Sequence, residues 1–365
     1  MDSTVYLMSA VGVSPRSGIS QEKAAQFVCA HDCRNTREER ILRAIYRKTK
    51  IDYRHSVLSE SRRSGSISLG EFFGAEGGRG PSTQERMLYF EKKAPALARR
   101  ATLAALRKAH LPAHLVGHIV SVSCTGAVSP GFDVPLIQSI GISKEASRTH
   151  VGFMGCHGVF NALRVASALA KTDARGQAAL ICSVELCSLH YELGGQWDLR
   201  RALTNALFSD GAAAAIVSST PAYPECWRIQ KTGSQVFKNS TTDMTWRVGN
   251  HGFAMYLSSK IPQLIRKNLK PWLSRWLASE GLSIQAIQSW ALHPGGPGIL
   301  DAIKESLSLP EEALAPSRTI LRKFGNMSSA TILFVLEELF RLKKKSPCVA
   351  LGFGPGLTVE AVLFL

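Results

Sequence analysis

The chain has 365 residues, 45% of them hydrophobic, which is enough for one large domain or two fused domains with an ample core. The formal net charge of +16 indicates either a solvated basic surface or an anionic partner, such as nucleic acid, a phosphate-bearing small substrate or an acidic carrier protein. There is no run of 18 apolar residues, and the first residues have too short an apolar core for a secretory signal, so we expect no membrane span and no export signal.

The N-terminal part is predicted to form a strand followed by helices. Residues 5–13 alternate weakly and end at a Ser-Pro pair, which favours a first strand. A helix follows from Ser20, its expected N-cap, to Cys29. The sequence RNTREERILRAIYR at 34–47 predicts an amphipathic helix with an arginine stripe, either a solvated face or a clamp for phosphates, which arginine binds bidentately. The stripe consists of Arg40, Arg43 and Arg47.

The middle of the chain is predicted to contain a loop, a long helix and buried strands. Residues 61–83 are rich in Ser, Gly and Arg and predict a surface loop. Residues 85–110 form one helical pattern, in which Pro95 predicts a kink or a break. Residues 115–124 predict an apolar strand, and residues 178–189 are too continuously apolar for a strand with an exposed face.

The second half of the chain repeats the alternation of strands and helices. Two prolines at 220–225 mark the boundary, which divides the chain into residues 1–222 and 223–365. Strands alternating with helices predict an α/β fold with mostly buried parallel or mixed sheets. The elements expected in the second half are a strand at 227–232, a helix at 257–277, a strand ending at His293, a helix after it, a helix after Asn326, and strands at 348–352 and 359–365.

The cysteines predict a reducing environment. The eight cysteines are scattered, mostly in apolar runs, and do not form a disulfide framework, so we expect a cytoplasmic protein. Cys29 and Cys33 flank His31, but no second pair of ligands follows at zinc-site spacing, and we expect no metal there. Glu185 lies inside a buried strand and must be paired or hydrogen-bonded, so we interpret it as structural.

Three polar side chains in separate turns predict a thiol active site. Cys156 lies in the glycine-lined turn VGFMGCHGVF before a helix at 159–169, where the helix dipole stabilises a thiolate, although a buried cysteine is more often an inert apolar side chain. His293 follows an apolar run, and Asn326 lies between a glycine and two serines ahead of an apolar helix. A cysteine, a histidine and an asparagine far apart in sequence can meet in the fold, as in other thiol enzymes.

Four longer motifs resemble the type III polyketide synthases, the chalcone and stilbene synthase family. They are FSDGAAA from Phe208, HPGGPGILD from His293, GNMSSA at 325–330 and GFGPGLTVE at 352–360. The resemblance runs in order from about Arg40 to the last residues. It implies a thiolase-like fold, a five-layer αβαβα sandwich of two similar halves, which works as a homodimer on acyl-CoA and malonyl-CoA and needs no cofactor.

The resemblance also assigns roles to residues. It places the nucleophilic cysteine and a CoA-binding basic helix in the first half, and the catalytic histidine and asparagine in the second. Cys156 would accept the acyl group, His293 would stabilise its thiolate as an ion pair, and Asn326 would join His293 in binding the enolate formed by decarboxylation. The arginine stripe would hold the phosphates of coenzyme A. The implied gatekeeper and pocket residues are Phe208, Met255, Cys124, Cys187, His190, Thr204, Ser209 and Ser328.

Several of these positions depart from the plant enzymes. Met255 stands where many have a second phenylalanine, and Cys187 and His190 replace threonines. Thr204 and Ser209 replace glycines, and the residue after the nucleophile is a histidine instead of an aromatic. These changes disfavour aromatic starters such as coumaroyl-CoA and favour a bacterial-type enzyme.

We therefore predict a synthase that extends a fatty acyl-CoA with malonyl-CoA and forms an alkylpyrone or an alkylresorcinol. The close alternative is a malonyl-primed synthase of a tetrahydroxynaphthalene-type polyol. A β-ketoacyl-ACP synthase of fatty-acid initiation and an HMG-CoA synthase share the expected fold, but the GFGPGLTVE motif argues against both. The non-enzymatic alternative is a nucleic-acid-binding protein, which would need basic runs on its surface. The compact lysine run is at 343–345, but it follows a predicted helix end, where cations are favoured in any case.

Overall fold

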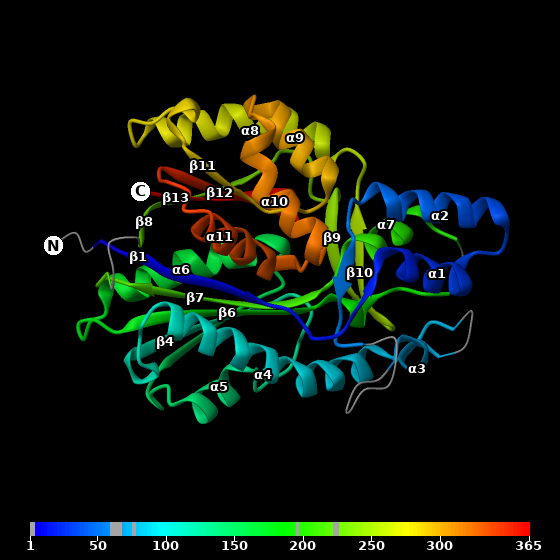
Figure 1. The fold of residues 1–365 in the computed structure, drawn as a ribbon, viewed down its shortest axis with the longest axis horizontal. Helices are drawn as coiled ribbons and strands as arrows, with labels where there is room; N and C mark the ends of the chain where they lie inside the picture. Colours follow the sequence, from blue (N-terminus) through cyan, green and yellow to red (C-terminus); the bar gives the residue numbers. More distant parts are fainter. Residues whose placement is uncertain (1–3, 59–67, 75–77, 195–196, 222–225) are drawn as a thin grey trace.

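The computed structural model describes residues 4–58, 68–74, 78–194, 197–221 and 226–365. In this part of the chain, two layers of strands alternate with three layers of helices (Figure 1). The strands of the two layers also connect into one mixed, nine-stranded sheet, in the order β11-β12-β13-β8-β1-β7-β6-β4-β5. The expected α/β fold, a five-layer αβαβα sandwich, is therefore confirmed.

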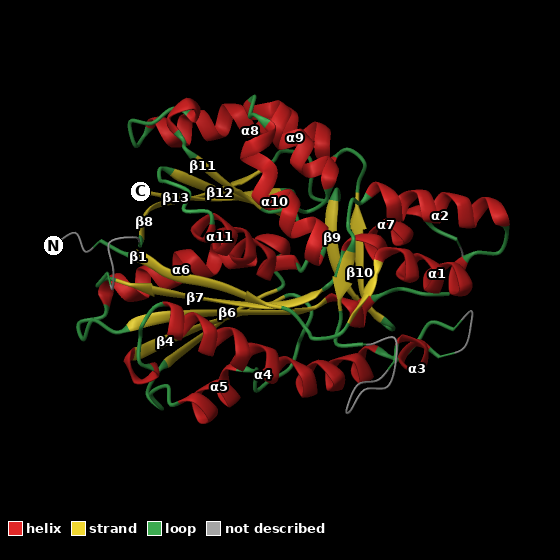
Figure 2. Cartoon of the chain, in the orientation of Figure 1, coloured by secondary structure: helices red, strands yellow, loops and turns green. Residues whose placement is uncertain are grey.

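The first strand layer belongs to the N-terminal half. Its strands are β1 (Tyr6–Val13), β4 (Val116–Ser123), β5 (Ser147–Gly152), β6 (Ala178–Leu186) and β7 (Asp210–Ser218). Helices cover both faces (Figure 2): α4 (Thr83–Lys108) and α5 (Asp133–Ile140) lie on the outer face, and α6 (Gly158–Thr172) lies on the inner one. Every residue of β6 is buried, as its continuous apolar sequence predicts.

The second strand layer belongs to the C-terminal half. Its strands are β8 (Trp227–Val236), β11 (Ser289–Leu292), β12 (Cys348–Gly354) and β13 (Thr358–Phe364). The outer helices are α8 (Ile261–Ala278), α9 (Pro297–Leu307) and α10 (Glu311–Phe324), and α11 (Thr331–Arg341) lies beside α6 in the central layer (Figure 1). The two layers meet where β8 pairs with the first residues of β1.

Smaller elements gather at one end of the sandwich (Figure 1). They are the helices α1 (Gln21–Asp32), α2 (Thr36–Lys48), α3 (Leu69–Phe73) and α7 (Leu199–Leu207), and the paired strands β2 (Gly18–Ser20) with β3 (Tyr53–His55) and β9 (Met244–Gly249) with β10 (Gly252–Leu257). Single turns of 3₁₀-helix lie at Ala113–Leu115, Gly155–His157, Cys187–His190, Ile284–Ala286 and Ser328–Ala330. None of the described helices has the length and apolar character needed to cross a bilayer.

The structure corrects some predicted boundaries. α4 continues through Pro95, so of the two predicted alternatives, a kink or a break, the break is wrong. The buried face of the helix packs against β1 and β7, and this packing outweighs one lost hydrogen bond. The helix predicted from residue 257 begins only at Ile261, because residues 252–257 pair with β9. The predicted strand at 178–189 ends at Leu186.

Two predictions fall partly outside the described residues. Of the predicted loop at 61–83, residues 61–67 and 75–77 are not described, and α3 interrupts the remainder. Ser68 caps α3 through a capping box with Glu71, a local signal that the loop prediction overlooked. The predicted boundary between residues 222 and 223 also lies outside the described part.

Candidate active site

The three predicted catalytic side chains line one cavity of about 690 Å³. Cys156 comes from the turn before α6, His293 from the end of β11 and Asn326 from the loop before α11. The segments that carry them lie at the ends of elements from both halves of the fold. The fold therefore brings together groups that lie up to 170 positions apart in the sequence.

Cys156 occupies a turn that only a glycine-containing sequence can form. Gly155 has a φ of +76°, and a Cβ atom there would meet the ring of Pro355 at 2.3 Å. The cysteine is 6% exposed, and this burial raises the pKa of its thiol to about 12. Hydrogen bonds from Ser328, from the Asn326 amide at 3.9 Å and from the backbone of the turn oppose that rise. These donors are the groups that would stabilise a thiolate.

His293 is almost fully buried and faces the same cavity. Its backbone N–H donates to Leu351 O at 2.8 Å, a hydrogen bond that anchors the end of β11 to strand β12. Neither ring nitrogen has a hydrogen-bond partner among the described residues, so both remain available to a substrate or to the thiol. Burial, with a smaller contribution from the nearby His157, lowers the pKa of the imidazole to about 3.

The directions of these two pKa shifts oppose the predicted ion pair of a thiolate and an imidazolium. Burial opposes a single charge on Cys156 and a single charge on His293, so the empty cavity favours a neutral thiol beside a neutral imidazole. Transfer of the thiol proton to His293 forms both charges together, and each then offsets the desolvation of the other. Burial of the empty cavity thus works against the predicted ion pair unless both charges form together.

Asn326 has a fixed amide orientation. Its Oδ1 accepts the N–H of Ser328 at 2.9 Å, so its NH₂ group must point the other way, toward Cys156 and Gly295 O. The backbone of Asn326 also pairs with the segment around Phe208: its N–H donates to Leu207 O, and its C=O accepts from Ser209 N, both at 2.9 Å. The donor and the segment carrying Phe208 are therefore held in one rigid unit.

The predicted pocket residues lie at different depths. Phe208 and Met255 line the cavity, and Cys187 packs with Cys156 and Phe208 in one apolar cluster. The Cys124 thiol accepts the N–H of Gly155 at 2.9 Å, so it supports the nucleophile's turn from behind. Ser328 hydrogen-bonds to Cys156. The hydroxyl groups of the other two predicted pocket residues donate to backbone carbonyls, that of Thr204 to Arg201 O and that of Ser209 to Phe324 O.

His190 does not lie among the described residues that line the cavity, and its ring is held on both sides. Nε2–H donates to Thr125 O at 2.7 Å, Nδ1 accepts the N–H of Phe253 at 3.1 Å, and the ring stacks on that of Phe253. The expectation that His190 is a pocket residue is therefore replaced by a structural role: its side chain fixes the β9–β10 hairpin to the core. Burial lowers the pKa of His190 to about 3.

This burial predicts a pH dependence of stability. Between about pH 6.5 and pH 3 the unfolded chain binds one more proton at His190 than the folded chain, so the free energy of unfolding falls as the pH falls. His190→Phe is expected to reduce that slope by about 1.4 kcal/mol per pH unit. Urea denaturation of both proteins at several pH values from about 6.5 down to about 4.5 measures it, and equal slopes would contradict it.

Two family models match the chain, one for each half. The model "Chalcone and stilbene synthases, N-terminal domain" matches residues 4–221, and the model for the C-terminal domain matches residues 228–365. The chain belongs to the chalcone and stilbene synthase family. It is thus a type III polyketide synthase, an acyltransferase of a family that works on CoA thioesters without a cofactor.

Individual relatives agree with this assignment. The α-pyrone synthesis polyketide synthase-like Pks18 of Mycobacterium tuberculosis is 31% identical over 360 residues, which cover 96% of this chain and 88% of Pks18. The structure of PKS-I from the brown alga Ectocarpus siliculosus has a TM-score of 0.90 at 26% identity and covers 99% of this chain and 98% of its own. Tetrahydroxynaphthalene synthase of Streptomyces coelicolor, at 24% identity, shares the fold with a TM-score of 0.87, with 98% of each chain covered.

The mouth of the synthase's cavity is basic, but the arginine stripe does not line it. On α2 the residues that reach the cavity are Ile45, Lys48 and the adjoining Thr49. Positions 40, 43 and 47 share the neighbouring face of the helix, and Arg43 pairs with Glu39 at 2.7 Å. The cations that do line the cavity are Lys48, Arg200 and Lys260, which the sequence analysis missed.

Arg54 is a further residue that the sequence analysis missed. It is 1% exposed and lies between the rings of Tyr46 and Tyr191. Its Nη1 donates to Phe208 O at 3.0 Å and to the Tyr191 hydroxyl at 2.6 Å. The backbone that carries the predicted gatekeeper is thus held by a buried guanidinium.

Glu185 is satisfied by hydrogen bonds, as its burial requires. Its carboxylate accepts the N–H of Cys124 at 3.0 Å, the Thr125 hydroxyl at 2.7 Å and the Ser329 hydroxyl. Burial raises the pKa of this carboxyl group. Because the Cys124 thiol supports the turn of Cys156 and Ser329 lies in the loop of Asn326, Glu185 ties the supports of both catalytic residues together.

The described residues contain no group of three His, Cys, Asp or Glu side chains close enough to hold a metal ion. His31, between Cys29 and Cys33, directs Nδ1 to Phe27 O at 2.9 Å. All eight cysteines are free thiols.

Proposed function

We propose that this synthase loads an alkyl acyl-CoA on Cys156, extends it with malonyl-CoA and cyclises the product to an alkylpyrone or alkylresorcinol. The observation that carries the proposal is the aliphatic wall of the cavity beside Cys156. Each methylene buried against such a wall contributes about 0.8 kcal/mol to binding. The wall includes Leu199, Leu203, Leu207, Met255, Leu257, Ile261 and Ile299. The name of Pks18, which refers to α-pyrone synthesis, supports the same product class.

Loading begins with a neutral thiol and a neutral imidazole. His293 takes the proton as Cys156 Sγ attacks the thioester carbonyl, and it returns that proton to the departing CoA thiolate. The acyl group is then a thioester of Cys156, and free CoA leaves by the mouth.

Extension uses the same donors on malonyl-CoA. Asn326 NH₂ and His293 N–H bind the thioester oxygen, so that loss of CO₂ leaves an enolate with its charge between two donors. The enolate carbon attacks the acyl thioester, the bond to Cys156 Sγ breaks, and the released thiolate takes a proton. Repetition and ring closure in the same cavity give the product.

The cations at the mouth suit the phosphates of coenzyme A. Lys48, Arg200 and Lys260 line the cavity from three separate segments, and the arginine stripe of α2 adds positive potential beside them. Lys48→Ala is expected to raise the KM for malonyl-CoA about tenfold with little change in kcat, since it weakens ground-state and transition-state binding equally. Arg43→Ala is the matched control and is expected to change KM less than about twofold.

Steady-state kinetics on the two variants decide between the two cation sets. If Arg43→Ala raised the KM more than Lys48→Ala did, the phosphates of coenzyme A would bind the arginine stripe instead.

We also propose that the protein is a cytoplasmic homodimer. Among the described strands, β5 lies at the edge of the sheet and pairs only with β4, and the exposed Phe153 and Met154 follow it directly before the nucleophile's turn. An open strand edge beside exposed apolar side chains favours pairing with a second copy. Sedimentation velocity is expected to give twice the mass of the chain, and Phe153→Asp is expected to shift it toward the monomer. A monomeric wild-type protein would refute the dimer.

The starter is tested by incubating the enzyme with malonyl-CoA and acyl-CoAs from acetyl-CoA to stearoyl-CoA, with products read by mass. We expect products that contain the alkyl chain, with kcat/KM highest for a medium or long chain. A product made from malonyl units alone at the same rate with every starter would instead indicate the malonyl-primed tetrahydroxynaphthalene-type synthase. Acyl groups supplied on an acyl carrier protein form a further arm of the same assay.

A further inference from the structure

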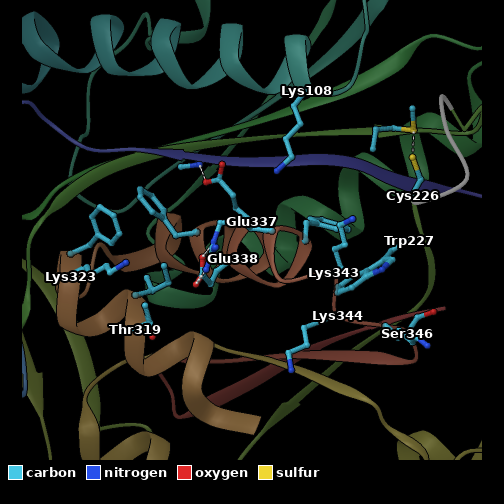
Figure 3. A pocket seen from close by; sticks show the side chains of 18 of the residues that line it. Lys108, Cys226, Trp227, Thr319, Lys323, Glu337, Glu338, Lys343, Lys344 and Ser346 are labelled. Atoms are coloured by element: carbon cyan, nitrogen blue, oxygen red, sulfur yellow. Dashed lines mark hydrogen bonds and ion pairs between the residues drawn. The ribbon is translucent and has the colours of Figure 1, made fainter. Parts of the chain in front are cut away.

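A second hollow, of about 1090 Å³, lies along α11 and is larger than the active-site cavity. Its walls come from β1, the end of α4, the start of β8, α10, α11 and the loop after α11 (Figure 3). No residue that lines it also lines the active-site cavity in the described chain. We call this hollow the α11 groove.

Lysines from three helix ends meet at the α11 groove. Lys108 comes from the end of α4, Lys323 from the last turn of α10, and residues 343–345 follow α11. Figure 3 shows Lys108, Lys323, Lys343 and Lys344 around the same hollow. Five lysines therefore line one concave surface.

The two acidic side chains of the α11 groove offset its five lysines only in part, Glu337 through the nearby charge of Lys108 and Glu338 through that of Lys323. Glu338 pairs with Arg341, with two N–O distances of 2.7 Å. Glu337 is half-buried and accepts the N–H of Gly12 at 2.8 Å. Within the described residues, none of the five lysines forms an ion pair with a carboxylate. The positive charge that lines the groove thus exceeds the negative charge.

Helix ends alone do not account for this arrangement. A lysine near a helix C-terminus is favoured by the helix dipole, which explains each position taken singly. It does not explain why three helix ends bring their lysines to one hollow, where like charges repel. An anionic partner would remove that repulsion.

The floor of the α11 groove is aromatic. The rings of Phe324 and Phe334 lie 5.2 Å apart, and those of Trp227 and Phe340 lie 4.6 Å apart. Trp227 is only 7% exposed and also contacts Phe364, so it offers no open face on which a base could stack. The half-buried rings of Phe324 and Phe340 are the parts of the floor that remain open to apolar side chains of a partner.

We propose that the α11 groove binds an acidic amphipathic segment of a partner protein. Apolar side chains of the segment pack on the aromatic floor, and its carboxylates meet the five lysines on the rim. A flat membrane surface contacts the rim of a hollow but not its floor. The proposal is independent of the starter and product of the synthase, because the groove is separate from the active-site cavity.

A labelled peptide tests the proposal on the full-length protein. The probe is a fluorescein-labelled amphipathic helix of about 15 residues, with leucines on one face and glutamates on the other. Fluorescence anisotropy is expected to show binding that weakens as salt is added. A peptide with serines in place of the leucines keeps the charge and is expected to bind at least about tenfold more weakly.

Matched charge reversals locate the site. The triple variant Lys343→Glu, Lys344→Glu and Lys345→Glu is expected to weaken peptide binding at least about tenfold. The control variant Lys267→Glu, Lys270→Glu and Arg275→Glu makes the same charge change at exposed positions of α8 and is expected to bind as the wild type does. Both variants are expected to keep wild-type polyketide turnover, which shows that they are folded.

A second variant, Lys108→Glu with Lys323→Glu, reverses charge on the other walls and is also expected to weaken binding. Equal weakening by the α8 control, or equal binding of the serine peptide, would overturn the proposal. The proposal would also be overturned if oligothymidylate or phosphatidylglycerol vesicles bound more tightly than the leucine peptide and the triple variant abolished that binding.

Discussion

Cys156→Ala is expected to abolish polyketide formation while leaving the decarboxylation of malonyl-CoA. Without the thiol no acyl-enzyme forms, so turnover is expected to fall by at least about 10⁴-fold. The decarboxylation needs only the donors of Asn326 and His293, which the substitution leaves in place. Acetyl-CoA should therefore still form from malonyl-CoA, uncoupled from chain extension.

Mass spectrometry of the intact protein checks this prediction. The wild type is expected to gain one acyl group from a starter acyl-CoA, and the Cys156→Ala protein none. Cys187→Ala is the matched control, because Cys187 packs in the same apolar cluster as Cys156, and burial raises its pKa well above the ordinary value. It is expected to keep the acyl adduct. An adduct that persists in Cys156→Ala and disappears in Cys187→Ala would show that Cys187 is the nucleophile instead.

The catalytic turn could be predicted because its causes are local. Gly155 takes a positive φ, and this local requirement shows in the sequence as a glycine next to Cys156, whereas its close approach to Pro355 in the other half of the chain does not. The buried strand β6 was equally visible, because a run of apolar residues with no alternation is buried on both faces. Such features depend on neighbours in sequence and survive any change in the rest of the fold.

The pocket could not be predicted in the same way, because its walls depend on distant contacts. The orientation of His190 is decided by Phe253, 63 positions later, in the β9–β10 hairpin. That hairpin was itself hidden, since the helix signal of α8 was extended back to residue 257. Lys48 was overlooked because the three arginines before it form a clearer helical stripe, whereas the face of α2 that meets the cavity is set by packing.

Asn326→Leu is expected to remove malonyl-CoA decarboxylation and leave the loading of Cys156 largely intact. The amide is oriented by the N–H of Ser328, which holds Oδ1 and thereby turns the NH₂ group toward the thiol. Losing one such donor lowers the rate of an oxyanion-forming step by about 10²–10³-fold, or roughly 3–4 kcal/mol. The imidazole of His293 still serves as the base for acyl transfer, so the acyl adduct should persist.

Asn326→Asp sharpens the test, since it keeps the shape of the side chain and the acceptor for Ser328 N–H. It replaces the NH₂ donor with a second oxygen, which repels the enolate instead of binding it. We therefore expect the aspartate variant to lose at least as much decarboxylation as the leucine variant, measured as ¹⁴CO₂ released from labelled malonyl-CoA. If the aspartate variant kept decarboxylation within about threefold of the wild type, the amide would serve only to shape the loop, and the enolate would depend on His293 alone.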